Sequence, residues 1–211
     1  MEHESAKIYI ASIEGLSYEK LYHAASSARK AKADKLRFTE DKLRCLAAEA
    51  LLRHALNEQG IRDYSIMTDE KGKPFLEGLP VHFNLSHSGS FVLCTLSTAP
   101  VGCDIQETKT ADLRLVRRYF APEEIKQLES TPPEHQTELF CRLWVLKESL
   151  GKALGCGLNE TVLRREFDLS GAAPVLKGSP ELFFREFSIP GYRCAVCSQC
   201  SDISSLAVVY L

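Results

Sequence analysis

Nothing in the sequence indicates a secretory leader or a membrane-spanning segment. Residues 1–5 have neither the positive flank nor the apolar stretch of a signal peptide. The longest run without Asp, Glu, Lys or Arg, residues 78–103, is interrupted repeatedly by Asn, Ser, Thr and His. A membrane helix needs about 20 consecutive, predominantly apolar residues. We therefore expect a soluble cytoplasmic protein with no membrane partner.

The sequence also lacks an excess of either charge and any low-complexity segment. Its 26 Lys and Arg nearly balance its 28 Asp and Glu, for a net charge of −2, so a general affinity for nucleic acid is not expected. The 211 residues, 45% of them hydrophobic, are enough for one large domain or two small ones with a packed core. This composition excludes disordered, collagen-like and coiled-coil chains.

The eight cysteines are expected to be reduced thiols in the cytoplasm. Cys194, Cys197 and Cys200 have a C-x2-C-x2-C spacing, which is typical of zinc or iron–sulfur ligands. No nearby Cys or His supplies a fourth ligand, and residues 193–197 have the pattern of a buried strand. We expect these thiols to pack as small apolar side chains, with a metal- or cluster-binding protein as the weaker alternative.

Hydrophobic periodicity divides the chain into two halves, each with helices followed by strands. In the first half we expect strands at residues 7–11, 66–68, 81–85, 91–96 and 101–105, and helices at residues 18–35 and 43–55, the second ending near Gly60. In the second half a helix follows Pro122, a long helix covers residues 136–154, and strands lie at residues 183–189, 192–197 and 206–210. The pattern predicts an α+β fold with a site at the interface of the halves.

Polar side chains are concentrated in residues 84–90, at the end of an apolar strand. Asn84, Ser86 and His87, with the backbone amides near Gly89, would make a cradle for phosphate oxygens. A polar turn between two strands is the alternative. A hydrolase nucleophile is not favoured, because no G-x-S-x-G frame surrounds Ser86.

The strand at residues 101–105 runs into two oxygen-bearing side chains, Asp104 and Gln106. Residues i and i+2 of a strand share a face, so both side chains would point the same way. Mg²⁺ is usually held by one or two carboxylates together with substrate phosphates and water. The pair therefore suggests a magnesium site, and a strand that simply enters a polar turn is the alternative.

Glu148 and Lys152 lie four residues apart on one face of the long helix. Alone, such a pair is a common surface feature that contributes about 0.2 to 0.5 kcal/mol. Together with a phosphate cradle and a strand-end acid, it suggests magnesium-assisted transfer at a pyrophosphate.

Cationic side chains occur in two further places. The first is the charged turn Lys71, Gly72, Lys73 and Pro74. The second is a run on neighbouring helices that includes Arg29, Lys32, Arg37 and Arg44. A solvated surface is the ordinary explanation of both, and the phosphates of a bound nucleotide are the functional one.

Three blocks of sequence, in this order and spacing, carry a family resemblance. They are FNLSHSG at residues 83–89, VGCDI at residues 101–105 and WVLKESLGK at residues 144–152. Together they resemble the signature of the 4′-phosphopantetheinyl transferases, and the length and two-half layout resemble the long, monomeric, surfactin-synthetase-activating type. The likeness extends from about Phe38 to Lys152 and weakens after Leu169.

The resemblance implies two similar α+β halves related by pseudo-twofold symmetry, with coenzyme A between them. Residues 1–103 would supply nucleotide and phosphate contacts, and residues 104–211 the metal site and the catalytic helix. The implied reaction transfers the 4′-phosphopantetheine arm of coenzyme A to a serine hydroxyl of an apo acyl or peptidyl carrier protein and releases adenosine 3′,5′-bisphosphate. Such enzymes serve fatty-acid, polyketide or nonribosomal peptide biosynthesis.

The resemblance also implies roles for individual residues. Asp104, Gln106 and Glu148 would hold Mg²⁺, or Mn²⁺ in its place, and Glu148, Lys152 and His87 would be the catalytic side chains. Glu148 is the candidate general base for the carrier serine. The residues that would contact coenzyme A are Arg29, Lys32, Arg37, Arg44, Lys71, Gly72, Lys73, Pro74, Asn84, Ser86, His87, Asp104, Glu148 and Lys152.

Gln106 departs from the family pattern, in which many members have a second acid at this position. A neutral ligand should weaken the affinity for Mg²⁺, so we expect an active enzyme that needs more of the ion. A non-catalytic coenzyme A or carrier-protein binding module of the same fold is the alternative function. For carrier docking we expect the apolar and basic stretch at residues 110–124, whose alternative is an amphipathic helix packed on the core.

Overall fold

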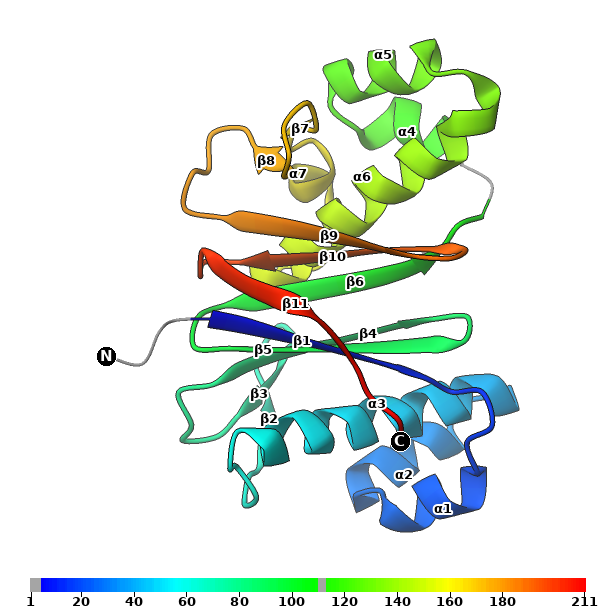
Figure 1. Cartoon of the computed structure of the whole chain (residues 1–211), viewed down its shortest axis with the longest axis vertical. Coiled ribbons are helices and arrows are strands. Elements are labelled where there is room, and N and C mark those ends of the chain that lie inside the picture. Colours follow the sequence, from blue (N-terminus) through cyan, green and yellow to red (C-terminus); the bar gives the residue numbers. More distant parts are fainter. Residues whose placement is uncertain (1–4, 110–112) are drawn as a thin grey trace.

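The computed structural model describes residues 5–109 and 113–211 as two main β-sheets covered by helices, with two further sheets of two strands each (Figure 1). The first part of the chain forms β1 (Ser5–Ser12), α1 (Tyr18–Ala24), α2 (Ser27–Asp34), α3 (Thr39–Glu58), β2 (Ile66–Thr68), β3 (Pro74–Leu76), β4 (His82–Ser88) and β5 (Phe91–Ser97). The second part forms β6 (Val101–Glu107), α4 (Leu113–Tyr119), α5 (Pro122–Ser130), α6 (Pro133–Ala153), α7 (Glu160–Leu163), β7 (Phe167–Asp168), β8 (Val175–Leu176), β9 (Phe183–Ile189), β10 (Tyr192–Ser198) and β11 (Asp202–Val208). The expected α+β class is confirmed.

The first sheet has the strand order β11-β1-β5-β4 and is covered by α3. Apolar side chains such as Leu51 and Leu52 on α3 pack against Tyr9, Val92 and Phe83 of the strands. Burial of side chains of this size stabilises the fold by about 1.5–3 kcal/mol each. Helices α1 and α2 then pack on the outer side of α3 (Figure 1).

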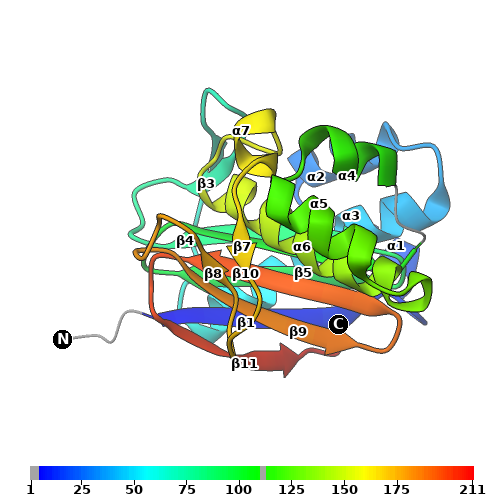
Figure 2. The same cartoon turned by 90° about the horizontal axis from the view of Figure 1, so that it is seen from above.

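The second sheet has the order β6-β10-β9, and its covering helix is α6. Leu143, Leu146 and Leu150 of α6 pack against Ala195 and Cys197 of β10. Seen from above, the helices lie on one side of the molecule, while β1, β9 and β11 lie on the other (Figure 2). None of the helices in the described ranges is long and apolar enough to cross a membrane.

A third apolar cluster joins the two sheets on the side away from α3 and α6. It contains Ile8 and Leu93 from the first sheet and Cys103, Ile105 and Val196 from the second. The expected boundary between residues 103 and 104 falls within β6, and β11 returns to pair in parallel with β1. The two sheets thus share a core, and the first sheet includes β11 from the C-terminal end of the chain.

Local signals explain where the observed elements differ from the expected ones. The helix expected over residues 18–35 is two helices, because Ser26 caps the start of α2 by accepting a hydrogen bond from the Arg29 amide. The charged turn at Lys71–Pro74 leads into a short strand, β3, which pairs with β2. The last strand begins at Asp202, earlier than the apolar run at 206–210 predicted.

Candidate active site

The three blocks of sequence meet in one cavity of about 220 Å³ at the junction of the two sheets. β4 contributes Ser86 and His87, β6 contributes Asp104 and Gln106, and α6 contributes Trp144, Glu148 and Lys152. The expected alternation on β6 holds, because Cys103 and Ile105 point into the core between the sheets while Asp104 and Gln106 line the cavity. The structure therefore brings together side chains separated by up to 66 residues.

A glycine allows β6 to approach α6 closely at this cavity. A Cβ atom at Gly102 would lie 2.2 Å from the carbonyl oxygen of Ser149 and 2.3 Å from the amide nitrogen of Ala153. Any larger residue would force the strand and the helix apart. Since Asp104 is two residues further along β6, this contact brings its carboxylate within reach of the helix.

Asp104 is bound by groups from both other elements of the cavity. Its Oδ1 accepts a hydrogen bond from Ser86 Oγ at 2.7 Å and an ion-pair contact from Lys152 Nζ at 2.5 Å. Ser86 Oγ also accepts from Lys152 Nζ at 3.2 Å and from the Ile105 amide at 3.3 Å. A serine hydroxyl has one donor and two acceptor positions, so protein partners occupy the whole capacity of Ser86.

The cavity changes the proton affinity of the two ionisable groups on α6. The pKa of Glu148 is raised, mainly because burial desolvates its carboxylate. The Lys152 ammonium acts in the opposite direction, and the Asp104 carboxylate adds to the increase. Desolvation acts to lower the pKa of Lys152, but the Asp104 carboxylate, with help from Cys103 and Glu148, outweighs it and raises the pKa. Glu148 therefore has the character of a proton acceptor of increased basicity, and Lys152 that of a permanent cation.

His87 lies at one edge of the cavity in a cationic environment. Desolvation by the surrounding protein lowers the pKa of its imidazole, and the charges of Arg44, Lys152 and Lys32 lower it further. Three cationic side chains around a neutral imidazole, which has one ring N–H donor, make a site suited to an anion. Arg44 is held here by Asp41 at 2.6 Å and by the carbonyl oxygen of Gly89 at 2.7 Å.

Other side chains that were expected to contact coenzyme A have partners within the protein. Arg29 donates to Cys45 Sγ at 3.8 Å, and the guanidinium of Arg37 lies over the ring of Phe38. The side-chain oxygen of Asn84 accepts from the amide of Cys103 at 2.9 Å. Of the four cations expected at the remote phosphate, Lys32 and Arg44 are the two that act on His87.

The charged turn at residues 71–74 borders a second cavity, of about 560 Å³, next to the end of α6. Lys71, Lys73 and Pro74 line it, whereas Gly72 shapes the turn with a positive φ of 85°. Lys73 Nζ donates to the carbonyl oxygens of Lys152 at 2.7 Å and Ala153 at 3.0 Å. A cation at exposed carbonyls stabilises a helix C-terminus, so Lys73 fastens the end of α6 that carries Lys152.

One important charged residue of the WVLKESLGK block was missed by the sequence reasoning. Lys147, next to Glu148, is fully buried and contacts Glu124 of α5 at 2.7 Å. Its ammonium also donates to the carbonyl oxygens of Leu163 and Arg165. Glu124 in turn accepts from the Phe167 amide. This buried and fully hydrogen-bonded pair connects α6 to α5 and to the segment after α7. The sequence signal that could have indicated it is a lysine on the apolar side of the helix.

The cysteine motif does not form a ligand set. On β10, Cys194 points into the core between the sheets and Cys197 into the core beneath α6. Cys200 lies near Ser97, with 3.3 Å between Sγ and Oγ. Among the residues described, no group of three or more His, Cys, Asp or Glu side chains could hold a metal ion.

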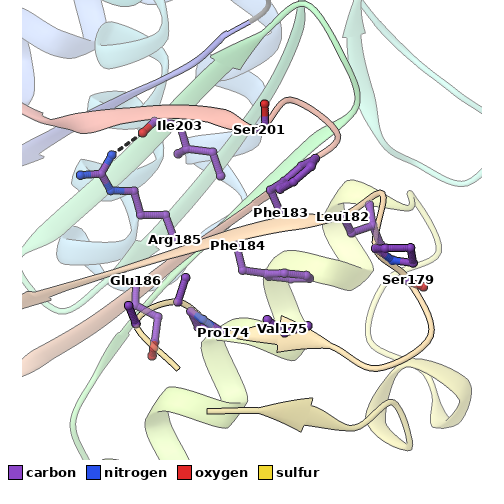
Figure 3. A pocket seen from close by; sticks show the side chains of 13 residues that line it. Pro174, Val175, Ser179, Leu182, Phe183, Phe184, Arg185, Glu186, Ser201 and Ile203 are labelled. Carbon is purple, nitrogen blue, oxygen red and sulfur yellow. Dashed lines mark hydrogen bonds between the residues drawn. The ribbon is translucent and has the colours of Figure 1, made fainter. Parts of the chain in front are cut away.

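A larger cavity, of about 630 Å³, lies away from this chemistry on the outer side of β9 (Figure 3). Its wall combines Phe183, Phe184 and Pro174 with the charged Arg185 and Glu186. Both charges are engaged, since Arg185 donates to the carbonyl of Ile203 and Glu186 is paired with Arg142.

The stretch expected to dock a carrier forms α4 and the start of α5, while residues 110–112 lie outside the described ranges. Val116 and Phe120 are buried in the core beneath α6. Arg117 pairs with Glu129, and Arg118 lies over the ring of Tyr119. In this part of the stretch an amphipathic helix is packed on the core with basic groups on its outer face.

Comparison with known proteins identifies the family of the chain. The family model described as the 4′-phosphopantetheinyl transferase superfamily matches residues 100–202. The chain is 34% identical to the 4′-phosphopantetheinyl transferase psf-1 of Bacillus pumilus, over 86% of this chain and 82% of that protein. It is 31% identical to the 4′-phosphopantetheinyl transferase Sfp of Bacillus subtilis strain 168, over 87% of this chain and 86% of that protein. The chain therefore belongs to the 4′-phosphopantetheinyl transferase superfamily.

Proposed function

We propose that this enzyme transfers the 4′-phosphopantetheine arm of coenzyme A to a serine hydroxyl of an apo carrier protein, acting as a monomer. The observation that carries the proposal is the convergence of Ser86, His87, Asp104, Glu148 and Lys152 in one cavity between the two sheets. The serine oxygen would form a bond to the phosphorus that bears the pantetheine arm. The bond from that phosphorus to the adenylate-side oxygen would break, and adenosine 3′,5′-bisphosphate would leave.

The basic edge of the cavity supports binding of the nucleotide. Lys32, Arg44 and the ring N–H of His87 would form an anion site for the 3′-phosphate. The neighbouring 560 Å³ cavity, with an apolar wall and the cations of the 71–74 turn at its rim, suits the adenosine. The pyrophosphate would then lie between these two places, over Lys152.

The donor set of the cavity fits Mg²⁺. Asp104 and Glu148 offer carboxylates and Gln106 an amide oxygen, and all three line the same small space. These are hard oxygen ligands, few enough that the ion would keep water and bind substrate phosphates. The Asp104 carboxylate also raises the pKa of Glu148, a repulsion that a cation between them would relieve. When bound, Mg²⁺ would offset charge that develops on the pyrophosphate.

The protein's own groups account for the remaining steps. Glu148, whose pKa desolvation raises, accepts the proton of the carrier serine as its oxygen attacks. Lys152 holds a positive charge beside the phosphate oxygens and stabilises the leaving group. Catalysis then rests on positioning and electrostatics, as is general for phosphoryl transfer.

The test is an intact-mass measurement on an apo carrier protein incubated with the enzyme, coenzyme A and Mg²⁺. We expect the carrier to gain one phosphopantetheine arm. Glu148→Gln should abolish the gain, whereas Glu134→Gln, an exposed acid in the first turn of the same helix, should leave it unchanged. Coenzyme A binding without any gain on acyl and peptidyl carriers would instead support the non-catalytic module.

A further inference from the structure

The seam between the two sheets is built from side chains of β4 and the backbone of β6. The amides of Cys103, Ile105 and Glu107 donate to side-chain oxygens of Asn84 at 2.9 Å, Ser86 at 3.3 Å and Ser88 at 3.0 Å. Partners differ by 19 residues in every rung, so β4 and β6 run in the same direction and in strict register. We call these three hydrogen bonds the seam ladder.

The seam ladder provides hydrogen-bond acceptors for the buried backbone amides of an edge strand. β6 is the edge strand of its sheet, yet Cys103 and Ile105 are buried. An unpaired buried amide costs roughly 1–3 kcal/mol. Three polar side chains at every second position of β4 supply the acceptors that a neighbouring strand would otherwise provide.

The ladder also sets the position of the catalytic groups. Asp104 lies between the first two rungs, and His87 lies between the second and third. Ser86, the middle rung, bonds both the Ile105 amide and the Asp104 carboxylate. Sliding β4 along β6 would break all three rungs at once, so the register of His87 against Asp104 is fixed.

A tyrosine from the second sheet anchors the far end of β4. Tyr192 Oη accepts from the amide of Ser90, in the turn between β4 and β5, at 3.0 Å. Gly89 makes room for it, because a Cβ atom there would lie 2.1 Å from that oxygen. The turn therefore cannot move away from the second sheet without losing this contact.

We propose that Asn84 and Ser88, the outer rungs of the seam ladder, are positioning residues of the transferase. They touch no substrate; they hold β4 in register with β6 so that the groups from β4 face Asp104 and Gln106. For Asn84 this replaces the expected contact with coenzyme A. The kinetic part of the inference rests on the proposed transfer reaction.

The test combines steady-state kinetics with amide hydrogen exchange, and Ser88→Ala is its main variant because Ser88 lies outside the cavity wall. We expect kcat to fall about ten- to hundredfold while KM for coenzyme A changes less than about threefold. The amide of Glu107 should exchange faster, and Ser88→Thr, which keeps the hydroxyl, should restore both values. Ser204→Ala is the matched control, because Ser204 lies on β11 and its Oγ donates to the carbonyl oxygen of the adjacent Ser205.

Two outcomes would overturn the inference. In the first, Ser88→Ala matches Ser204→Ala in both kcat and Glu107 exchange. In the second, Asn84→Ala raises KM for coenzyme A and leaves kcat intact, which is the behaviour of a direct substrate contact. If the wild-type enzyme modifies no carrier, the proposed function fails, and unchanged exchange at Cys103 and Glu107 in the variants would separately reject the ladder.

Discussion

The long helices α3 and α6 carry the same pattern of charge and use it differently. Each covers one sheet, and each has a glutamate followed four residues later by a cation: Glu49 and Arg53 on α3, Glu148 and Lys152 on α6. Glu49 accepts from the amide of Ser26 at 3.0 Å and from its hydroxyl at 2.6 Å. Arg53 donates to the carbonyl of Ala24 at 2.8 Å. Both charges on α3 thus hold the link between α1 and α2.

On α6 the same spacing faces a cavity. Lys152 contacts Asp104 of the second sheet and Ser86 of the first, and Glu148 lines the same cavity. The difference comes from what packs opposite: a helix connection covers α3, whereas a sheet junction with a strand-end acid lies against α6. An i,i+4 charged pair therefore says little about function until its neighbours are known.

The largest expected effect is on kcat, and it distinguishes Glu148 of α6 from Glu49 of α3. Glu148→Gln should lower kcat about 10²- to 10⁴-fold, as loss of a general base does, with little change in stability. Glu49→Gln should do the reverse and lower the free energy of unfolding by about 1–3 kcal/mol, because it weakens buried charged hydrogen bonds. Urea unfolding and carrier modification rates measured on both variants check this, and equal kinetic losses would abolish the distinction.

A second prediction concerns the neighbouring lysine of α6. Lys147→Met should lower the free energy of unfolding by about 3–5 kcal/mol, because it leaves Glu124 and two carbonyl groups buried without their cation. Lys126→Met, on the exposed side of α5, should change stability by less than about 0.5 kcal/mol. Thermal unfolding followed by circular dichroism gives both values, and similar losses in the two variants would show that the buried pair is not structural.

A third prediction uses the pKa of Glu148. Lys152 lowers this pKa and so opposes the desolvation that raises it; Lys152→Met should therefore move the carboxyl titration to still higher pH. Carbon-13 NMR of the side-chain carboxyl in the metal-free protein measures the shift. Since a base must be deprotonated to accept a proton, the variant would need higher pH to reach the active form. A titration that moves to lower pH would contradict the charge arrangement of the cavity.

The smallest expected effect concerns the ion. Gln106→Glu should reduce the Mg²⁺ concentration needed for half-maximal transfer, because a third carboxylate adds negative charge to the donor set. Gln136→Glu, at the start of α6 and away from the cavity, serves as the control. An unchanged Mg²⁺ requirement in Gln106→Glu would remove Gln106 from the proposed ligands.

Much of the fold followed from local signals. The strand expected at residues 7–11 is β1, and the helix expected over residues 43–55 is α3, since strong periodicity marks each. Residues 18–35 were harder, because the apolar periodicity continues across the Ser26 cap that separates α1 from α2. The pairing of β11 with β1 could not be read from the chain, because it joins segments almost 200 residues apart.

By itself, the sequence determined the α+β class and the three blocks with their chemistry, because periodicity and residue type are local properties. Only the tertiary structure decided what each side chain does. The side-chain oxygens of Asn84 and Ser86, predicted to contact phosphate, accept amides of β6, and the ammonium of Lys73, predicted to contact a nucleotide, donates to carbonyls at the end of α6. None of these contacts within the protein can be read from the sequence, and the ligand contacts stay predictions. A polar group serves whichever partner the fold places within about 3 Å, and that placement is set by the packing of distant segments.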